Sequence, residues 1–137
     1  MDRATYLLPI KSDVLENTNE LTAYLRFLSS VVDIVIVDGS DGPVFASHAS
    51  EWSGLALHIA PDPSVPGLNG KARGVLSGLR RIVSEKIIIA DDDVRYDERS
   101  IWLVLEALSS YDVVRPQNYF APRTWHTLLD SGRTLLN

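Results

Sequence analysis

The sequence predicts an α/β fold in which a mostly parallel sheet is flanked by helices. Short apolar segments rich in Val, Ile and Leu alternate with longer segments in which apolar residues recur every three or four positions. The first pattern is typical of buried strands and the second of amphipathic helices. Strand and helix patterns alternate four times along the chain. Such alternation favours parallel strands, because each helix carries the chain back to the start of the next strand.

The first half of the chain is expected to hold three strands, over 5–10, 33–37 and 55–59. A helix follows the first strand, since apolar residues at 21, 24, 25, 28 and 31 form one stripe, and Thr18 or Asn19 can cap it. A dense group of turn formers at 38–43 ends the second strand, and a weaker helix is expected over 44–52. The segment 61–69 contains three prolines and is expected to be a loop.

The second half begins with a predicted helix over 70–84, in which Gly74 and Gly78 share one side and permit close approach to the sheet. An apolar strand over 87–90 follows, with a composition that suits burial on both faces. A helix capped by Asp97 is expected over about 98–109, and a fifth strand over 112–115. The remainder is mixed, with a helix expected after Pro122. Two tryptophans in helical patterns, Trp52 and Trp102, are expected in the core.

Length and composition indicate a single soluble domain over residues 1–137. Hydrophobic residues make up 45% and charged residues 23%, as in ordinary globular proteins. The formal charge of −5 argues against a nucleic-acid partner, which favours a basic surface. The absence of cysteine excludes disulfides and thiolate metal sites. No apolar segment is long enough to span a bilayer, so we expect a cytoplasmic protein or one at the cytoplasmic face of a membrane.

The strand at 87–90 ends in three consecutive carboxylates, Asp91, Asp92 and Asp93. Three adjacent negative charges repel one another and therefore favour a positive partner. A divalent cation with a phosphate ligand fits this requirement, because Mg²⁺ and Mn²⁺ bind oxygen from one or two carboxylates and from substrate phosphates. The alternative is a solvated acidic turn that precedes the next helix.

Two further polar groups are expected at the same edge of the sheet. Pro9, Ile10 and Lys11 end the first strand, and Asp38, Gly39 and Ser40 end the second. Ligands of open parallel sheets bind beyond the carboxyl ends of the strands, so the coincidence predicts a site there. The Asp38 carboxylate can accept hydrogen bonds from a base or a sugar, or it can close an Asx turn with the two residues that follow.

Two basic residues, Lys71 and Arg73, occupy the first turn of the helix at 70–84. Cations oppose the helix dipole at this end, where free N–H groups favour an anion. A bound phosphate would account for the conflict, and so would ordinary solvated side chains.

The order and spacing of these segments resemble the nucleotide-binding half of a family 2 glycosyltransferase with the GT-A fold, a Rossmann-like architecture. The resemblance covers roughly residues 5–120. The residues that carry it are Pro9, the run Val35-Ile36-Val37-Asp38-Gly39-Ser40, the run Gly70-Lys71-Ala72 with Gly78, and the run Ile87-Ile88-Ile89-Ala90-Asp91-Asp92-Asp93. Members of the family usually carry two acidic residues before the Gly-Ser pair, whereas this chain carries Asp38 alone.

The resemblance implies transfer of a sugar from a nucleotide-diphosphate donor to an acceptor hydroxyl, with Mg²⁺ or Mn²⁺ as Lewis acid. It implies that Asp93 and Asp91 bind the metal, with Asp91 directed toward the ribose and Asp92 able to replace either. The other implied nucleotide-binding residues are Pro9, Asp38, Gly39, Lys71 and Arg73. The acceptor, whether glycan, lipid or small molecule, is not indicated.

The family's general base comes from a later, acceptor-binding half, and members are generally longer than this chain. We therefore expect an N-terminal fragment truncated after the fifth strand, or an unusually short member. Asp130 is expected to have a surface or capping role. An uncovered strand edge would lead to self-association. Four residues, listed here, are expected either to form an acceptor platform or to pack at the end of the sheet: Tyr119, Phe120, Trp125 and His126.

Three other functions remain open. A phosphatase of the haloacid dehalogenase type also places an aspartate at a strand end, but Arg95 stands where its motif requires Thr or Val. A nucleotidyltransferase would need a glycine- and basic-rich loop after Pro9, which is absent. A non-catalytic domain would bind nucleotide or a partner chain without turnover. No role is expected for His48 or His58, since neither has a carboxylate or a second histidine at ligand spacing.

Overall fold

A computed structural model of the chain confirms the α/β class, and it describes residues 3–66 and 69–117. The chain divides into two compact units, Met1–Tyr96 and Asp97–Asn137. The elements of the first unit are β1 (Thr5–Ile10), α1 (Asn19–Ser29), β2 (Asp33–Asp38), α2 (Gly42–Glu51), β3 (Leu57–Ile59), α3 (Gly70–Leu79) and β4 (Ile87–Ile89). The second unit contains α4 (Glu98–Leu108).

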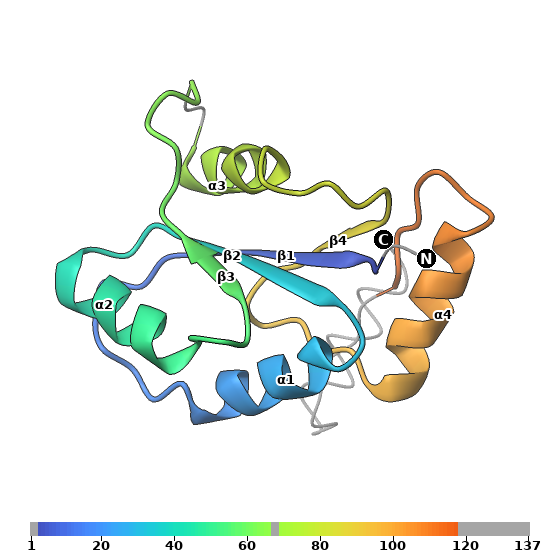
Figure 1. Ribbon diagram of the computed structural model, residues 1–137, viewed down its shortest axis with the longest axis horizontal. Coiled ribbons are helices and arrows are strands. Elements are labelled where there is room, and N and C mark those ends of the chain that lie inside the picture. Colours follow the sequence, from blue (N-terminus) through green and yellow to red (C-terminus); the bar gives the residue numbers. More distant parts are fainter. Residues whose placement is uncertain (1–2, 67–68, 118–137) are drawn as a thin grey trace, which may run out of the picture. The chain divides into compact units, whose positions relative to one another are not determined.

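The sheet has the strand order β3-β2-β1-β4, and every neighbouring pair is parallel. In the register of β1, Ile10 lies opposite Asp38 of β2 and Leu7 lies opposite Ile89 of β4. The chain moves outward from β1 through β2 to β3 and then returns to the other side of β1 (Figure 1). The order of strands therefore reverses between β1 and β4, which makes their carboxyl ends the switch point of the sheet.

Helices cover both faces of the sheet within the first unit. α3 lies on one face, and α1 and α2 lie on the other (Figure 1). The core beneath α3 contains Leu7, Val35 and Val37, packed against partly buried residues such as Val75 and Leu79. Alternate residues of the same strands point to the opposite face. This double coverage explains why β1 and β2 are apolar along nearly their whole length.

The close approach expected for Gly74 and Gly78 is confirmed. A Cβ added at Gly78 would lie 2.3 Å from Leu7 Cδ1, and one added at Gly74 would lie 3.2 Å from Pro9 Cβ. Any side chain at position 78 would therefore occupy space that β1 already fills. The two glycines bring the axis of α3 close to β1, and this places the start of the helix beside the carboxyl ends of the strands.

β4 is less buried than its composition predicted. Ile88 is buried, whereas Ile87 is partly buried and Ile89 is 50% exposed. The expectation of burial on both faces is wrong, because among the described residues β4 lies at the edge of the sheet and pairs with β1 alone. An apolar strand composition does not distinguish a central strand from an edge strand.

The fifth strand expected at 112–115 is also wrong, since residues 111–117 form no regular secondary structure. Its two apolar residues are flanked by Asp112 and Arg115, and a strand requires a partner that local sequence does not supply. Trp52 is fully buried, as expected, but Trp102 is 54% exposed and its predicted core position is wrong. Trp102 lies off the apolar stripe of α4. The expectations for Pro122, Asp130 and the four possible acceptor residues fall outside the described residues.

The predicted starts of α1, α3 and α4 are confirmed, whereas α2 begins at Gly42, two residues before its predicted start. Asp97 caps α4 in a capping box with Ser100. Thr18 is the N-cap residue of α1, but its side chain makes no capping hydrogen bond. The Thr18 hydroxyl instead donates to the carboxylate of Glu51, at the end of α2. A tertiary hydrogen bond has replaced the local one.

Candidate functional site

The acidic loop, residues 91–93, follows β4 directly at the switch point. All three carboxylates are exposed. The nearby guanidinium of Arg95 donates to the carbonyl oxygen of Asp92 at 2.6 Å and pairs with Glu20 at 2.7 Å. Arg95 therefore binds the backbone of the loop and a neighbouring glutamate. The carboxylates of the acidic loop stay available on the surface of the described chain, apart from one ion pair.

That ion pair joins Asp91 to Lys71, from the first turn of α3. The side chains are 50% and 61% exposed, respectively. The helix start is well defined, because the side chain of Asn69 accepts a hydrogen bond from the Ala72 N–H at 2.8 Å. The structure thus brings together two groups that are 20 positions apart in the sequence. It also gives a third explanation for a lysine at the positive end of a helix, a neighbouring carboxylate. Arg73 is exposed.

The ends of β1 and β2 are joined to each other at the same edge. The Gly39 N–H donates to the carbonyl oxygen of Ile10 at 2.9 Å. The Ser12 N–H donates to the Ser40 hydroxyl at 2.8 Å. The clusters predicted at the two strand ends therefore form one connected surface. Pro9, the next-to-last residue of β1, lies against Gly74 of α3.

Asp38 is buried at this edge, with 1% of its surface exposed. Its Oδ1 accepts the Ser40 N–H at 2.9 Å, which confirms the Asx turn. Its Oδ2 accepts hydrogen bonds from His48 Nδ1 at 2.7 Å and His58 Nε2 at 2.8 Å. Burial raises the pKa of Asp38, but the hydrogen bonds from Ser40 and the two rings outweigh it, so the pKa lies below its ordinary value.

The premise that neither histidine has a carboxylate within reach is wrong, because both rings contact Asp38. His58 lies opposite Ile36 in the register of β3 and β2. Side chains two residues apart on a strand share a face, so Asp38 and His58 lie on the same face of neighbouring strands. His48 reaches the same carboxylate from α2. The alternation of β2 and β3 was the only signal in the sequence for this contact, and it is usable only once the pairing of the strands is known.

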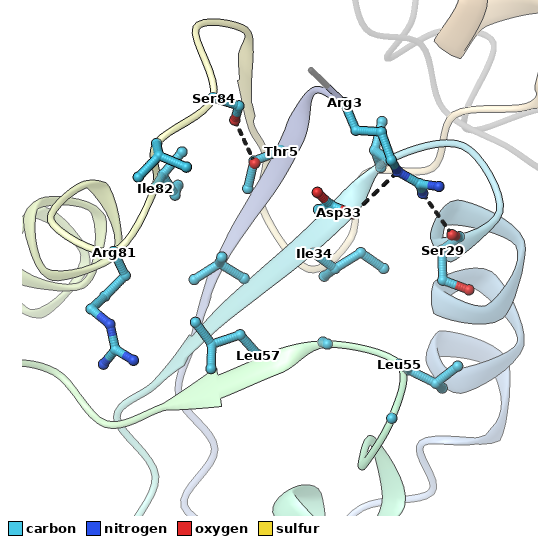
Figure 2. A pocket seen from close by; sticks show the side chains of 15 residues that line it. Arg3, Thr5, Ser29, Asp33, Ile34, Leu55, Leu57, Arg81, Ile82 and Ser84 are labelled. Atoms are coloured by element: carbon cyan, nitrogen blue, oxygen red, sulfur yellow. Dashed lines mark hydrogen bonds and ion pairs between the residues drawn. The ribbon is translucent and has the colours of Figure 1, made fainter. Parts of the chain in front are cut away.

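A concave surface that encloses about 730 Å³ lies at the amino ends of the strands, opposite the acidic loop. It is lined by residues at the starts of β1, β2 and β3, including Thr5, Asp33 and Leu57 (Figure 2). Arg3 Nε pairs with an oxygen of Asp33 at 3.1 Å, and the hydroxyls of Thr5 and Ser84 lie 2.6 Å apart. These four polar side chains are therefore paired with each other. Because it lies at the amino ends of the strands, the concave surface is separate from the surface around the acidic loop.

Comparisons with known proteins identify no relative. No family model matches the sequence, and neither a curated protein nor a solved structure matches it significantly. No helix in the described part of the chain is both long enough and apolar enough to cross a membrane.

Proposed function

We propose that this chain binds a nucleoside-diphosphate sugar through a divalent cation, as the donor-binding part of a glycosyltransferase similar to family 2. One observation carries the proposal: the acidic loop lies at the switch point between β1 and β4, where open parallel sheets bind their ligands. Lys71 meets the loop there from the start of α3. Carboxylates suited to a cation and an ammonium suited to a phosphate therefore lie side by side.

The donor atoms of the acidic loop fit Mg²⁺ or Mn²⁺. They are carboxylate oxygens, which these cations prefer, and their exposure leaves room for phosphate oxygens to complete the coordination. We assign the cation to Asp93 and Asp91, with Asp92 contacting the nucleotide. The bound cation would supply Lewis-acid stabilisation of the charge on the leaving diphosphate.

Lys71 supports this assignment through its ion pair with Asp91. In the free protein the ammonium neutralises one of three adjacent carboxylates and so lowers their mutual repulsion. A cation at Asp91 repels the ammonium, which is then available to a diphosphate oxygen. The N–H groups at the start of α3 favour the same anion, and Arg73 adds a second exposed positive charge.

The nucleoside is assigned to the surface formed by the ends of β1 and β2. Pro9 offers an apolar surface, and Gly39 lets the backbone approach a ligand without a side chain in the way. Asp38 contributes by holding the turn at residues 38–40, since its second oxygen is engaged by the two imidazoles. We therefore expect base contacts to come mainly from backbone groups of this turn.

Isothermal titration with UDP and GDP, each with and without Mn²⁺, tests the proposal. We expect one of the nucleotides to bind only when the cation is present. Asp93→Asn should weaken this binding about tenfold or more, equivalent to about 1.4 kcal/mol. Glu85→Gln is the matched control, because it removes the same charge near the other end of β4 and should leave the affinity unchanged.

Binding that is independent of Mn²⁺, or equal in Asp93→Asn and the wild type, would contradict the proposal. A non-catalytic nucleotide-binding domain is the second candidate, favoured by the same geometry at the acidic loop. Release of nucleoside diphosphate from UDP- and GDP-sugars in the presence of acceptor mixtures would exclude the non-catalytic domain, whereas an intact donor is expected both from that domain and from a donor-binding part that lacks its general base.

A further inference from the structure

A second cluster of ligand atoms lies within the first unit, formed by Asp38, His48 and His58. Their Oδ2, Nδ1 and Nε2 atoms all lie within 4.8 Å of one another. Their side chains are 0%, 7% and 6% exposed, respectively. They come from the end of β2, from α2 and from β3, so the cluster connects three elements. We call these three residues the Asp–His–His cluster.

The surroundings fix each member of the cluster in place. Trp52 stacks on the His48 ring, with ring centroids 4.5 Å apart and planes 18° apart. Phe45 lies against the His58 ring at a centroid distance of 4.4 Å. The Ser40 N–H donates a hydrogen bond to Oδ1 of Asp38, the oxygen that the two rings do not contact. Packing therefore holds the three ligand groups close to one another, which limits the conformational freedom that they would lose on binding an ion.

We infer that the Asp–His–His cluster is a binding site for a divalent transition-metal ion, with Zn²⁺ the best fit. Two imidazole nitrogens and one carboxylate oxygen are a common Zn²⁺ ligand set, with water in the fourth position. Imidazole also distinguishes this site from the acidic loop, whose oxygen ligands favour Mg²⁺ or Mn²⁺. The near-complete burial leaves no access for a substrate, so the metal would stabilise the junction of β2, α2 and β3. The inference shares Asp38 with the proposed nucleotide site but does not require nucleotide binding.

Binding a metal requires all three side chains of the cluster to adjust. Without metal, both rings donate an N–H to Asp38 Oδ2, at 2.7 and 2.8 Å. To bind the ion, each ring has to present the lone pair of that nitrogen, with its ring proton carried on the other nitrogen. Ligand atoms of tetrahedral Zn²⁺ lie about 3.3 Å apart, given bonds of about 2.0–2.2 Å. The Asp38 oxygen therefore has to move about half an ångström away from each nitrogen, and the two nitrogens, which lie up to 4.8 Å apart, have to approach each other by as much as about 1.5 Å.

Zinc titration of the metal-free full-length chain, in competition with a chromophoric chelator, tests the inference. We expect the wild type to bind one equivalent of Zn²⁺. His48→Gln and His58→Gln should each weaken binding by at least about 10- to 100-fold, the loss caused even by removal of groups that only orient a ligand. His126→Gln, which removes the remaining histidine of the chain, is the matched control and should bind like the wild type. Asp93→Asn should also bind like the wild type, because it alters the acidic loop alone.

The outcome does not depend on the variants being folded. In the wild type, the side-chain ¹⁵N resonances of His48 and His58 should shift on addition of Zn²⁺, while those of His126 stay in place. Absence of binding by the wild type would overturn the inference and leave a hydrogen-bonded cluster. Unchanged affinity in folded His48→Gln or His58→Gln, or unchanged resonances of the two cluster histidines, would overturn it as well.

Discussion

Lys71 places a positive charge beside the acidic loop and also lies at the end of α3 where a phosphate would bind. Its ion pair with Asp91 is exposed on both sides, and exposed pairs contribute at most about 1 kcal/mol. The pair therefore matters less for folding than for the charge of the site. Without the ammonium, the three carboxylates of the loop have no ion-pair partner among the described residues.

Lys71→Met should separate cation binding from nucleotide binding. We expect Mn²⁺ alone to bind up to about fivefold more tightly, because the variant removes a repulsive charge worth about 1 kcal/mol or less. We expect the nucleotide to bind more weakly in the presence of Mn²⁺, because its diphosphate loses a positive partner. Both affinities are measurable by titration calorimetry. Arg81→Met is the control: it removes a positive charge from the concave surface at the starts of β1, β2 and β3 and should change neither affinity. Parallel changes of both affinities in Lys71→Met would contradict the assignment.

The residues of the candidate site differ in how well local sequence patterns predict their positions. The placement of Asp91 at a strand end and of Lys71 at a helix start could be predicted, because both follow from local patterns and from the rule that parallel strands end at one edge. The partners of Asp38 could not be predicted. Its contacts with His48 and His58 depend on which strand pairs with β2 and on how α2 packs, and neither is encoded in a local window.

At the scale of elements, α3 connects the core to the candidate site. Its apolar residues pack on Leu7 and Val37, while its first turn reaches the acidic loop. The glycine at position 78 is the point of closest approach to the sheet. The position of Lys71 therefore depends on how closely α3 packs against β1.

Gly78→Ala should destabilise the protein by up to about 2 kcal/mol, since overpacking a core costs about 1–3 kcal/mol and the alanine regains about 1 kcal/mol of helix propensity. The added Cβ would lie 2.3 Å from Leu7 Cδ1 and 3.0 Å from Val37 Cγ2. Leu7 is fully buried, so its side chain has little room to move aside.

Chemical denaturation of the variant and the wild type measures the effect. Gly70→Ala is the control in the same helix, since no atom lies within 4 Å of the added Cβ. Equal stability of the two variants would show that α3 can move away from β1 without cost.

Element prediction succeeded where an amphipathic stripe was long and failed where tertiary pairing decided the outcome. The helices α1, α3 and α4 begin where the sequence predicted, because caps and periodicity are local signals. The segment 112–115 resembled a strand in composition but forms none. The edge position of β4 was likewise invisible in its composition.

At the scale of the whole molecule, Glu51 links the covering helices α1 and α2 of the first unit. It accepts hydrogen bonds from the hydroxyls of Thr18 and Thr22, the latter at 2.6 Å. The Thr22 hydroxyl in turn accepts the indole N–H of the fully buried Trp52 at 3.0 Å. The hydrogen bonds from Thr18 and Thr22 lower the pKa of Glu51.

The depressed pKa predicts a contribution of Glu51 to stability that depends on pH. A carboxyl whose pKa is lower in the folded state stabilises the fold above its unfolded pKa, about 4.3 for glutamate. This contribution is lost as the pH falls through the folded pKa. Glu51→Gln should therefore be less stable than the wild type by on the order of 1 kcal/mol at pH 7, and the difference should shrink below about pH 4.

Denaturation free energies of both proteins, measured from pH 7 down to pH 3, test this prediction. Glu85→Gln provides a control on an exposed acidic side chain and should follow the wild type across the range. A stability difference for Glu51→Gln that stays constant with pH would mean that the charge of the carboxylate contributes nothing.

The sequence by itself determined the α/β class, the order of the elements in the first unit and the edge at which Pro9, Gly39 and the acidic loop gather. These features follow from periodicity, from turn residues and from the common direction of parallel strands. Only the tertiary structure decided that Asp38 turns inward to His48 and His58 and that Lys71 pairs with Asp91. Such contacts join residues 10 or more positions apart, and only the packed arrangement of strands and helices brings their side chains within bonding distance.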